Sequence, residues 1–253
     1  MHVVVCAKQI PDPATPSKLD PQTHLLVRPN EQILDDTDRY GVEMGLRIAG
    51  ATGGTVTLVS MGPTGSMQGI RQALAMGADK AVVVDDGDLK GSDALTTAKV
   101  LAAAIRREGF DLVMAGTEST DGYSGVVPQQ VAELLKVPAL TYATKVEVEG
   151  STVRIHRQTS AGYDVVEAEA PAVVSVTAGV VEPRYPTFKG IMDAKKKPIE
   201  TLTVTDLDID TLDFGQQVTE LAAAPGREAG EKVEDDGEAH VRIVQLLERV
   251  KVI

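Results

Sequence analysis

The chain has 253 residues, of which 43% are hydrophobic, so it is long enough for one large folded domain with extensions and is not expected to be disordered as a whole. Its 37 acidic residues outnumber its 25 basic residues and give a formal net charge of -12. This balance argues against general binding to nucleic acid.

A single cysteine, Cys6, excludes an internal disulfide framework and any multi-cysteine zinc or iron–sulfur site within this chain. The apolar first residues are followed at once by Lys8 and Pro11, which is unlike a signal peptide, and no apolar run approaches the length of a membrane span. We therefore expect a cytoplasmic protein, in a reducing compartment, without direct insertion into a membrane.

The first two-thirds of the chain alternate β-branched runs with helical patterns, which indicates βαβ units and a parallel sheet covered on both faces. Strands are predicted at His2–Ala7, Thr55–Met61, Lys80–Asp85 and Phe110–Ala115, and helices at Thr37–Ala49, Ser66–Met76, from the Ser92-Asp93 cap to Arg107, and from Pro128 to about Lys136. Acidic side chains precede the first helix, and Gly53 and Gly77 end the first two. The predicted fold class is α/β, an open, doubly wound, mostly parallel sheet of the Rossmann-like kind.

The pattern changes after Pro138. Residues Thr141–Val148 and Thr152–Gln158 alternate in polarity around a Glu-Gly turn, which predicts an antiparallel hairpin that extends the same sheet, and Ala172–Thr177 is predicted as a further buried strand. Periodicity is lost from about Asp206, and residues 222–238 are rich in Ala, Gly, Glu and Asp, as in a solvated arm. We therefore expect one α/β domain at 1–205 and a C-terminal arm at 206–253.

The arm ends in a predicted helix, Ala239–Val250, with Val241, Val244 and Leu247 on one side. Such an isolated apolar stripe is too short to be stable without a surface to cover. The helix could grip a partner subunit or pack back on its own domain, and the residues alone leave both possibilities open.

Residues 182–197, E-P-R-Y-P-T-F-K-G-I-M-D-A-K-K-K, place apolar side chains beside four lysines. The residues predicted to dock a partner are Tyr185, Phe188, Ile191, Met192, Lys195, Lys196 and Lys197. Two prolines would stiffen the entry to this loop, and the lysines would keep it soluble and steer acidic partners. The alternative is a short helix whose Ile191 and Met192 pack into the core. Composition alone does not decide between them.

A second segment, Glu118–Pro128, joins the end of a strand to the start of a helix. Open α/β sheets bind ligands at this place, and the free N–H groups and the helix dipole favour a phosphate. Gly122 and Gly125 let the backbone approach closely, and Ser124 adds a hydroxyl donor. A P-loop lysine and the G-x-G-x-x-G spacing are both missing, which disfavours an NTPase or a common dinucleotide enzyme. The alternative is a flexible turn capped by Asp121.

No residue pattern in the chain points to catalysis. The four histidines, at positions 2, 24, 156 and 240, lack the spacing of metal ligands, and His156 is expected to face solvent from a strand. Carboxylate pairs at 35–36, 85–86 and 235–236 fall in expected loops or in the arm, where helix capping or solubility explains them. We therefore assign no metal site, no general acid or base and no enzymatic activity.

Four segments resemble the electron transfer flavoprotein beta (small) subunit family. They are C-A-K-Q-I-P-D at 6–12, A-L-A-M-G-A-D-K at 73–80, P-A-V-V-S-V at 171–176 and the segment 182–197. The resemblance implies an adenine nucleotide alpha-hydrolase-like fold in which the ends of three strands hold a structural AMP. The residues to which it assigns AMP binding are Cys6, Ala7, Lys8, Asp35, Asp36, Thr37, Asp38, Met61, Gly116, Thr117, Glu118, Asp121, Gly122, Tyr123, Ser124, Gly125, Val126 and Val127. Cys6 is expected to make contact and not to act as a nucleophile.

Family members that bind a second FAD at this place and bifurcate electrons typically show D-G-D-T-A-Q-V-G-P, whereas this chain reads D-G-Y-S-G-V-V-P. Tyr123 replaces the acid and Val126 the glutamine, which favours AMP and the housekeeping type of the family. By resemblance, the large (alpha) subunit holds the redox FAD, and this chain shelters part of the ring through the Ile10–Pro13 loop. The chain has three Phe, five Tyr and no Trp, so it offers few stacking surfaces of its own for a flavin.

The resemblance further implies that the segment 182–197 docks acyl-CoA and related dehydrogenases of fatty acid β-oxidation. Phe188 stands where the family normally has a leucine anchor, and electrons would pass on to a quinone-reducing acceptor of the respiratory chain. Two other classes stay open. A nucleotide-sensing module of the universal-stress type would use the same strand ends in a homodimer, and an adenylating enzyme would need a signature such as S-G-G-x-D-S, which this sequence lacks.

Overall fold

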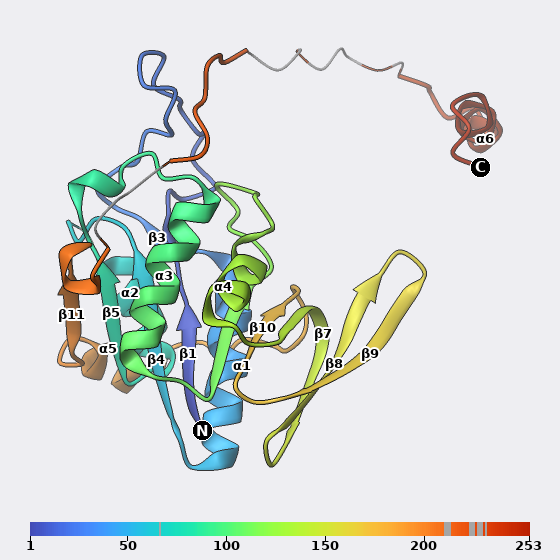
Figure 1. Cartoon of the computed structure of the whole chain (residues 1–253). Helices are drawn as coiled ribbons and strands as arrows, with labels where there is room; N and C mark the ends of the chain where they lie inside the picture. The colour runs from blue at the N-terminus through green and yellow to red at the C-terminus, as the bar shows by residue number, and fades with distance from the viewer. Residues whose placement is uncertain (66, 210–213, 223–225, 227–229, 231) are drawn as a thin grey trace. The chain divides into compact units, whose positions relative to one another are not determined.

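The computed structural model describes the chain except at residues 66, 210–213, 223–225, 227–229 and 231. Its internal contacts divide the chain into two units, Met1–Thr219 and Glu220–Ile253. The first unit contains the sheet and the second contains one helix (Figure 1). No helix in the described part of the chain has the length and apolar character needed to cross a bilayer.

A nine-stranded sheet forms the centre of the first unit, in the order β11-β5-β4-β1-β6-β10-β7-β8-β9 (Figure 1). Its strands are β1 (His2–Cys6), β4 (Thr55–Met61), β5 (Lys80–Val84), β6 (Leu112–Gly116), β7 (Ala139–Glu149), β8 (Thr152–Thr159), β9 (Gly162–Glu169), β10 (Ala172–Val176) and β11 (Ile199–Leu202). All pairings from β11 to β7 are parallel, and β7–β8 and β8–β9 are antiparallel. The predicted α/β class with an antiparallel extension of the same sheet is confirmed.

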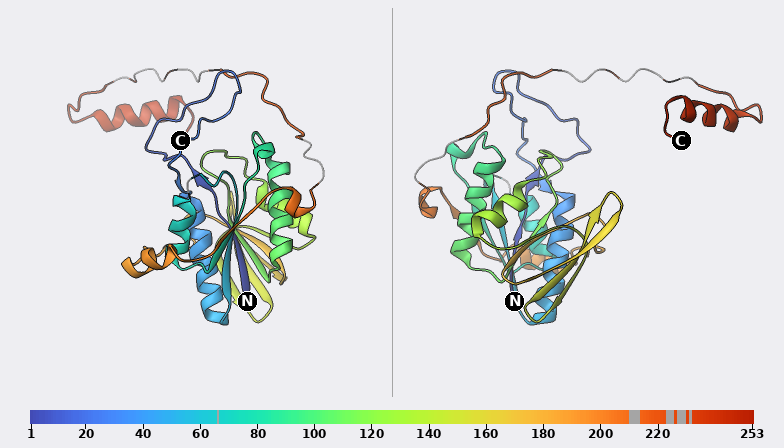
Figure 2. Two further views of the ribbon diagram at one scale, coloured as in Figure 1. Left: turned by 90° about the vertical axis from the view of Figure 1, so that its left-hand side faces the viewer. Right: turned by 45° about the vertical axis from the view of Figure 1, so that its right-hand side comes forward.

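Helices cover both faces of the parallel part of the sheet (Figure 2). On one face lie α1 (Asp36–Thr52) and α2 (Gln68–Met76), and on the other lie α3 (Ala94–Glu108) and α4 (Val127–Leu135). In β1, Val3 and Val5 pack into the core beneath α1 and α2, while Val4 packs into the core beneath α3 and α4. Because successive side chains of a strand point to opposite faces, a strand buried on both sides is mostly apolar along its length. The continuous apolar runs of the sequence are therefore the parallel strands.

The ends of the helices follow the predicted caps. Asp35 caps α1 by accepting a hydrogen bond from the backbone two residues on, and Gly53 ends this helix in the left-handed conformation, with φ 64°. Gly77 ends α2, and Asp93 caps α3. The predicted start of α2, Ser66, lies outside the described residues.

The antiparallel extension has three strands and not the two of the predicted hairpin. The additional strand, β9, pairs with β8 along its whole length, and its Tyr163 stacks on His156 with the ring centroids 4.4 Å apart. His156 is consequently half-buried, and the expectation that it faces solvent is wrong. Tyr163 and Val165 of β9 remain 59% and 58% exposed, whereas Val166 and Ala168 pack against the core, so apolar residues on both faces obscure the alternation that marks a half-buried strand.

Several short elements were not predicted. The edge strand β11 has four residues, too few to establish a period of two, and it pairs with β5. The helix α5 (Phe188–Ala194) lies in the segment for which the sequence left a docking loop and a short helix open. A separate two-stranded sheet pairs β2 (Gln9–Ile10) with β3 (Ile33–Leu34), and short 3-10 helices occupy Gly87–Leu89 and Thr205–Leu207.

The second unit contains α6 (Ala239–Arg249), which confirms the helix predicted at the end of the arm. None of its residues is buried. Val241, Ile243, Val244 and Leu246 are between 42% and 56% exposed. Within the second unit these apolar side chains are open to solvent, and the surface that α6 covers stays a prediction.

Candidate functional site

The carboxyl ends of β4, β1 and β6 are neighbours in the sheet, and the first turn of α1 is fastened to them. The backbone N–H of Lys8 donates to Asp38 Oδ2 at 2.6 Å, and Asp35 N–H donates to Lys8 O at 3.0 Å. Residues 6–8, 35–38 and 116–127, predicted from distant parts of the sequence, are thereby brought together. We call these three segments, with Met61 at the end of β4, the strand-end site.

Asp35 organises the strand-end site from its centre. Its side chain is fully buried and accepts hydrogen bonds from four donors. The N–H and hydroxyl of Thr37 reach Oδ1 at 3.0 and 2.9 Å, and the N–H and hydroxyl of Thr120 reach Oδ2 at 2.7 and 3.1 Å. One carboxylate therefore caps α1 and also holds the loop that follows β6.

A second buried acid, Asp38, lies beside Asp35 and Cys6. Burial, and then the charge of Asp35, raise the pKa of Asp38 well above its ordinary value, although the backbone N–H groups of Lys8 and Gly116 oppose this. Burial, and then Asp38, raise the pKa of the Cys6 thiol to about 12. Cys6 is thus a neutral thiol at physiological pH, which makes it a poor nucleophile.

Gly116, the last residue of β6, allows α1 to approach the strand closely. A Cβ atom at this position would lie 2.9 Å from Thr37 Oγ1 and 3.0 Å from Asp38 Oδ1. Thr37 Oγ1 in turn lies 2.8 Å from Glu118 O, as well as within reach of Asp35. The absence of a side chain at position 116 is therefore a requirement of this packing and not only of ligand access.

The loop after β6 carries a compact charge cluster. Asp121 accepts from Lys8 Nζ at 2.6 Å and from Arg28 Nη2 at 2.5 Å, and Lys8 Nζ also donates to Ser119 Oγ at 3.1 Å. Burial would raise the pKa of Asp121, but the charges of Lys8 and Arg28 outweigh it and hold this pKa below its ordinary value. The three side chains leave a net positive charge beside the strand-end site.

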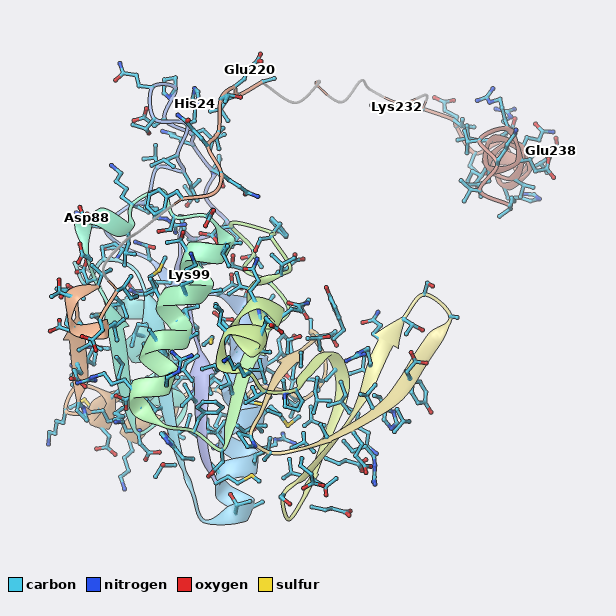
Figure 3. All side chains as sticks on the ribbon, viewed as in Figure 1. His24, Asp88, Lys99, Glu220, Lys232 and Glu238 are labelled. Atoms are coloured by element: carbon cyan, nitrogen blue, oxygen red, sulfur yellow. The ribbon has the colours of Figure 1, made fainter. Side chains whose placement is uncertain are left out.

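Arg28 belongs to a long connection, residues 11–32, between β2 and β3. His24 in the same connection, labelled in Figure 3, has its ring Nδ1 3.1 Å from Val218 O. The connection is therefore held at two points. Arg28 binds Asp121 in the strand-end site, and His24 contacts Val218, which follows the 3-10 helix Thr205–Leu207.

The start of α4 faces this site without a side-chain cap. Val126 at the cap position makes no capping hydrogen bond, and Pro128 in the first turn has no N–H. Gly125 has φ 65° and Tyr123, which is 67% exposed, has φ 49°, so the loop turns sharply just before the helix. An uncapped helix start presents N–H groups and the positive end of its dipole, which is suited to an anion.

Not all predicted residues share these surroundings. The hydroxyl of Thr117 donates to Val176 O at 3.0 Å and so ties β6 to β10. Asp36 has a side chain that is 70% exposed and lies 3.4 Å from Arg39. Thr117 therefore has a structural role in the sheet, and the side chain of Asp36 is mainly exposed. The part of the chain that the structure describes contains no cluster of three or more His, Cys, Asp or Glu side chains suited to a metal.

Residues 182–197, which we call the docking segment, combine the two alternatives that the sequence left open. The helix α5 forms there and is capped by Thr187, and of its apolar residues only the small Ala194 enters the core. Tyr185 and Phe188 are 79% and 82% exposed, and Ile191 and Met192 are each 48% exposed. The docking segment is therefore an ordered structure with an apolar outer surface, which is unusual for a surface helix without a partner.

Two interacting residues were missed by sequence reasoning, Arg28 and Glu43. Arg28 contacts Asp121 across 93 residues of sequence. Glu43 is 2% exposed within α1 and pairs with Arg184, 141 residues away. A signal did exist for Glu43, because a carboxylate among the apolar residues of a buried helix face requires a partner.

Residues 23–207 match a family model described as "Electron transfer flavoprotein domain". The chain is 40% identical to "Electron transfer flavoprotein subunit beta" of Mycobacterium tuberculosis (strain ATCC 25618 / H37Rv), over 100% of this chain and 99% of the relative. It is 35% identical to the protein of the same name from Megasphaera elsdenii, over 99% and 98% of the two chains. It is 34% identical to "Caffeyl-CoA reductase-Etf complex subunit CarD" of Acetobacterium woodii, over 92% of each.

Proposed function

Because this chain belongs to the family of electron transfer flavoprotein beta subunits, as its segments predicted, we propose that it is the small subunit of a heterodimer that carries electrons and has no substrate chemistry of its own. The observation that carries this proposal is the alignment with a beta subunit along 100% of the chain. It includes the docking segment and the C-terminal helix as well as the sheet. The FAD, held mainly by the alpha subunit, would supply the redox chemistry.

The strand-end site of this chain is proposed to hold AMP in a structural role. Two features support a ligand with a phosphate: the uncapped start of α4 and the net positive charge of the Lys8, Asp121 and Arg28 cluster. The backbone of residues 6–8 would border the base, and the loop 117–126 would receive the phosphate. Asp35 would keep that loop in place.

The docking segment is proposed to receive acyl-CoA and related dehydrogenases. Phe188, 82% exposed at the start of α5, would insert into an apolar pocket of the donor, and Lys195 and Lys196, both exposed, would steer the encounter. A small contact of this kind suits a carrier that must release each donor after transfer. Electrons would then pass to a quinone-reducing acceptor, in the cytoplasm and in the context of fatty acid β-oxidation.

The arm, residues 206–253, is proposed to hold the alpha subunit. The exposed apolar side chains of α6 would cover a surface of that partner. The Ile10–Pro13 part of the long connection would shelter the edge of the flavin ring, and this chain's own few aromatic residues leave the rest of the pocket to the alpha subunit.

Co-expression with candidate alpha subunits tests the proposed function. We expect a yellow heterodimer that releases one FAD and one AMP on denaturation. A colourless homodimer with bound nucleotide would instead indicate a sensor of the universal-stress type, and ATP turnover by this chain would indicate an adenylating enzyme. A second FAD in place of AMP would contradict the assignment of the strand-end site.

A further inference from the structure

The docking segment is fastened to the domain at several points although its outer surface is apolar. At its start, Arg184 donates from Nε to Glu43 Oε2 at 2.6 Å and from Nη2 to Glu43 Oε1 at 3.2 Å. The backbone N–H of Arg184 donates to the same Oε2 at 3.2 Å. Two parallel bonds from one guanidinium to one carboxylate fix orientation as well as distance.

Glu43 has a second cation in Arg47, one turn further along α1. Arg47 Nε donates to Glu43 Oε1 at 2.8 Å, and its Nη2 reaches Glu182 O at 3.4 Å. The side chain of Glu43 is 3% exposed, whereas those of Arg47 and Arg184 are 55% and 46% exposed. A single buried carboxylate therefore joins the middle of α1 to the first residues of the docking segment.

The far end of the docking segment rests on α2. A Cβ atom at Gly190 would lie 2.5 Å from Ala75 O, so α5 touches the backbone of α2 directly. Arg71 donates to Ala194 O at 2.8 Å, and Lys197 Nζ donates to two carbonyls at the end of α2, at 2.6 and 3.0 Å. Lys197 is thus hydrogen-bonded to the backbone at the end of α2, whereas Lys195 and Lys196 are exposed.

These contacts hold α5 by its inner side, whereas the entry, residues 182–187, is held by the ion pairs of Glu43 and by Arg39, whose guanidinium carbon lies 5.7 Å from the centre of the Tyr185 ring. We propose that Glu43 is a positioning residue, whose buried carboxylate clamps Arg184 and keeps Tyr185 and Phe188 in the arrangement that receives the donor. The inference rests on the proposed docking function of this segment. Glu43 itself is buried, so it acts on the donor only through the segment that it holds.

The physical effect is preorganisation. A segment that must order itself when the donor arrives loses part of its binding free energy to that ordering, whereas a clamped segment does not. Loss of the clamp should therefore weaken encounter with the donor and leave electron transfer within the formed complex unchanged. In kinetic terms KM rises and kcat stays constant.

Glu43→Gln in the yellow heterodimer tests this, with Glu133→Gln, the same change at an exposed position of α4, as the matched control. We expect KM for a substrate-reduced acyl-CoA dehydrogenase to rise about tenfold with Glu43→Gln and not with the control, at unchanged kcat and flavin content. Arg184→Lys keeps the charge, loses the paired bonds and leaves Glu43 with Arg47, so it carries the test should Glu43→Gln fail to fold. Equal KM values for both variants and the control would overturn the proposal.

Limited trypsin digestion supplies a readout that needs no donor. Cleavage after Lys189 should be faster in Glu43→Gln and Arg184→Lys than in the control, because the clamp restrains the chain beside it. If cleavage is faster in the two variants but no dehydrogenase reduces the wild-type protein, the clamp is supported and the docking function is contradicted. Unchanged cleavage in both variants would contradict the clamp itself.

Discussion

Replacing Gly116 by alanine should damage the strand-end site in a measurable way. The added Cβ would lie 2.9 Å from Thr37 Oγ1, 3.0 Å from Asp38 Oδ1 and 3.2 Å from Thr37 Cβ. Neither neighbour can move freely, because Thr37 Oγ1 lies 2.8 Å from Glu118 O and Asp38 Oδ2 accepts from Lys8 N–H at 2.6 Å. Overpacking of this kind costs about 1–3 kcal/mol of unfolding free energy, to which a weakened hydrogen bond adds about 1 kcal/mol.

The combined loss of about 2–4 kcal/mol corresponds to a fall of roughly 4–16 °C in Tm for a chain of this size. Thermal unfolding of the purified protein, followed by circular dichroism, measures it, and the AMP released on denaturation should fall in parallel. Gly50→Ala is the matched control, since no atom lies within 4 Å of its Cβ position in α1, and it should gain up to about 1 kcal/mol. A Gly116→Ala protein with the Tm and AMP content of the wild type would refute the packing argument.

Three further predictions concern single side chains. Phe188→Ala should lower kcat/KM with a reduced dehydrogenase about tenfold or more at unchanged flavin content. The control is Val165→Ala, at a position 58% exposed on β9. Equal kcat/KM values for the two variants would contradict the role of Phe188 as an anchor. The Cys6 thiol, with its pKa raised from 9.0 to about 12, should react with a thiol reagent at pH 8 roughly a thousandfold more slowly in the folded than in the unfolded protein, and comparable rates would contradict the raised pKa. Burial alone would raise the pKa of Glu43, but the hydrogen bonds of Arg184 and Arg47 lower it below 4.5; its stabilisation is therefore complete above that pH and is lost as pH falls through the lowered pKa. The unfolding free energy of wild type should therefore exceed that of Glu43→Gln near neutral pH, and the difference should shrink as pH falls through the lowered pKa; a difference that does not change with pH would contradict the ion pair.

The parallel strands and the helices between them could be predicted because their signals lie in short stretches of the sequence. Val3–Val5 form an uninterrupted apolar run. Gly53 and Gly77 end their helices with a positive φ, which glycine adopts readily. The strand-end site was found for a related reason, since the ends of neighbouring parallel strands must meet at one edge of the sheet. The three segments that were predicted separately do come together there.

The rest depends on contacts that no local pattern reveals. β9 is held by pairing with β8, and apolar residues lie on both of its faces, because Tyr163 and Val165 stay exposed while Val166 and Ala168 pack against the core. The docking segment was predicted either as a loop or as a buried helix, and it is a helix with an exposed apolar side because Gly190 and Ala194, not Ile191 and Met192, face α2. The partners of Asp121 and Glu43 lie 93 and 141 residues away and emerge only from the folded topology.

Reduction of the heterodimer by a physiological type of donor tests the central claim most directly. The co-expressed, yellow protein would be mixed anaerobically with a substrate-reduced acyl-CoA dehydrogenase, and its flavin absorbance followed by stopped flow. The account predicts that the flavin of the heterodimer bleaches, and that the rate falls at high salt because the exposed lysines of the docking segment steer the encounter. A flavin that stays oxidised with every such donor, or a chain that assembles no flavoprotein with any alpha subunit, would contradict it.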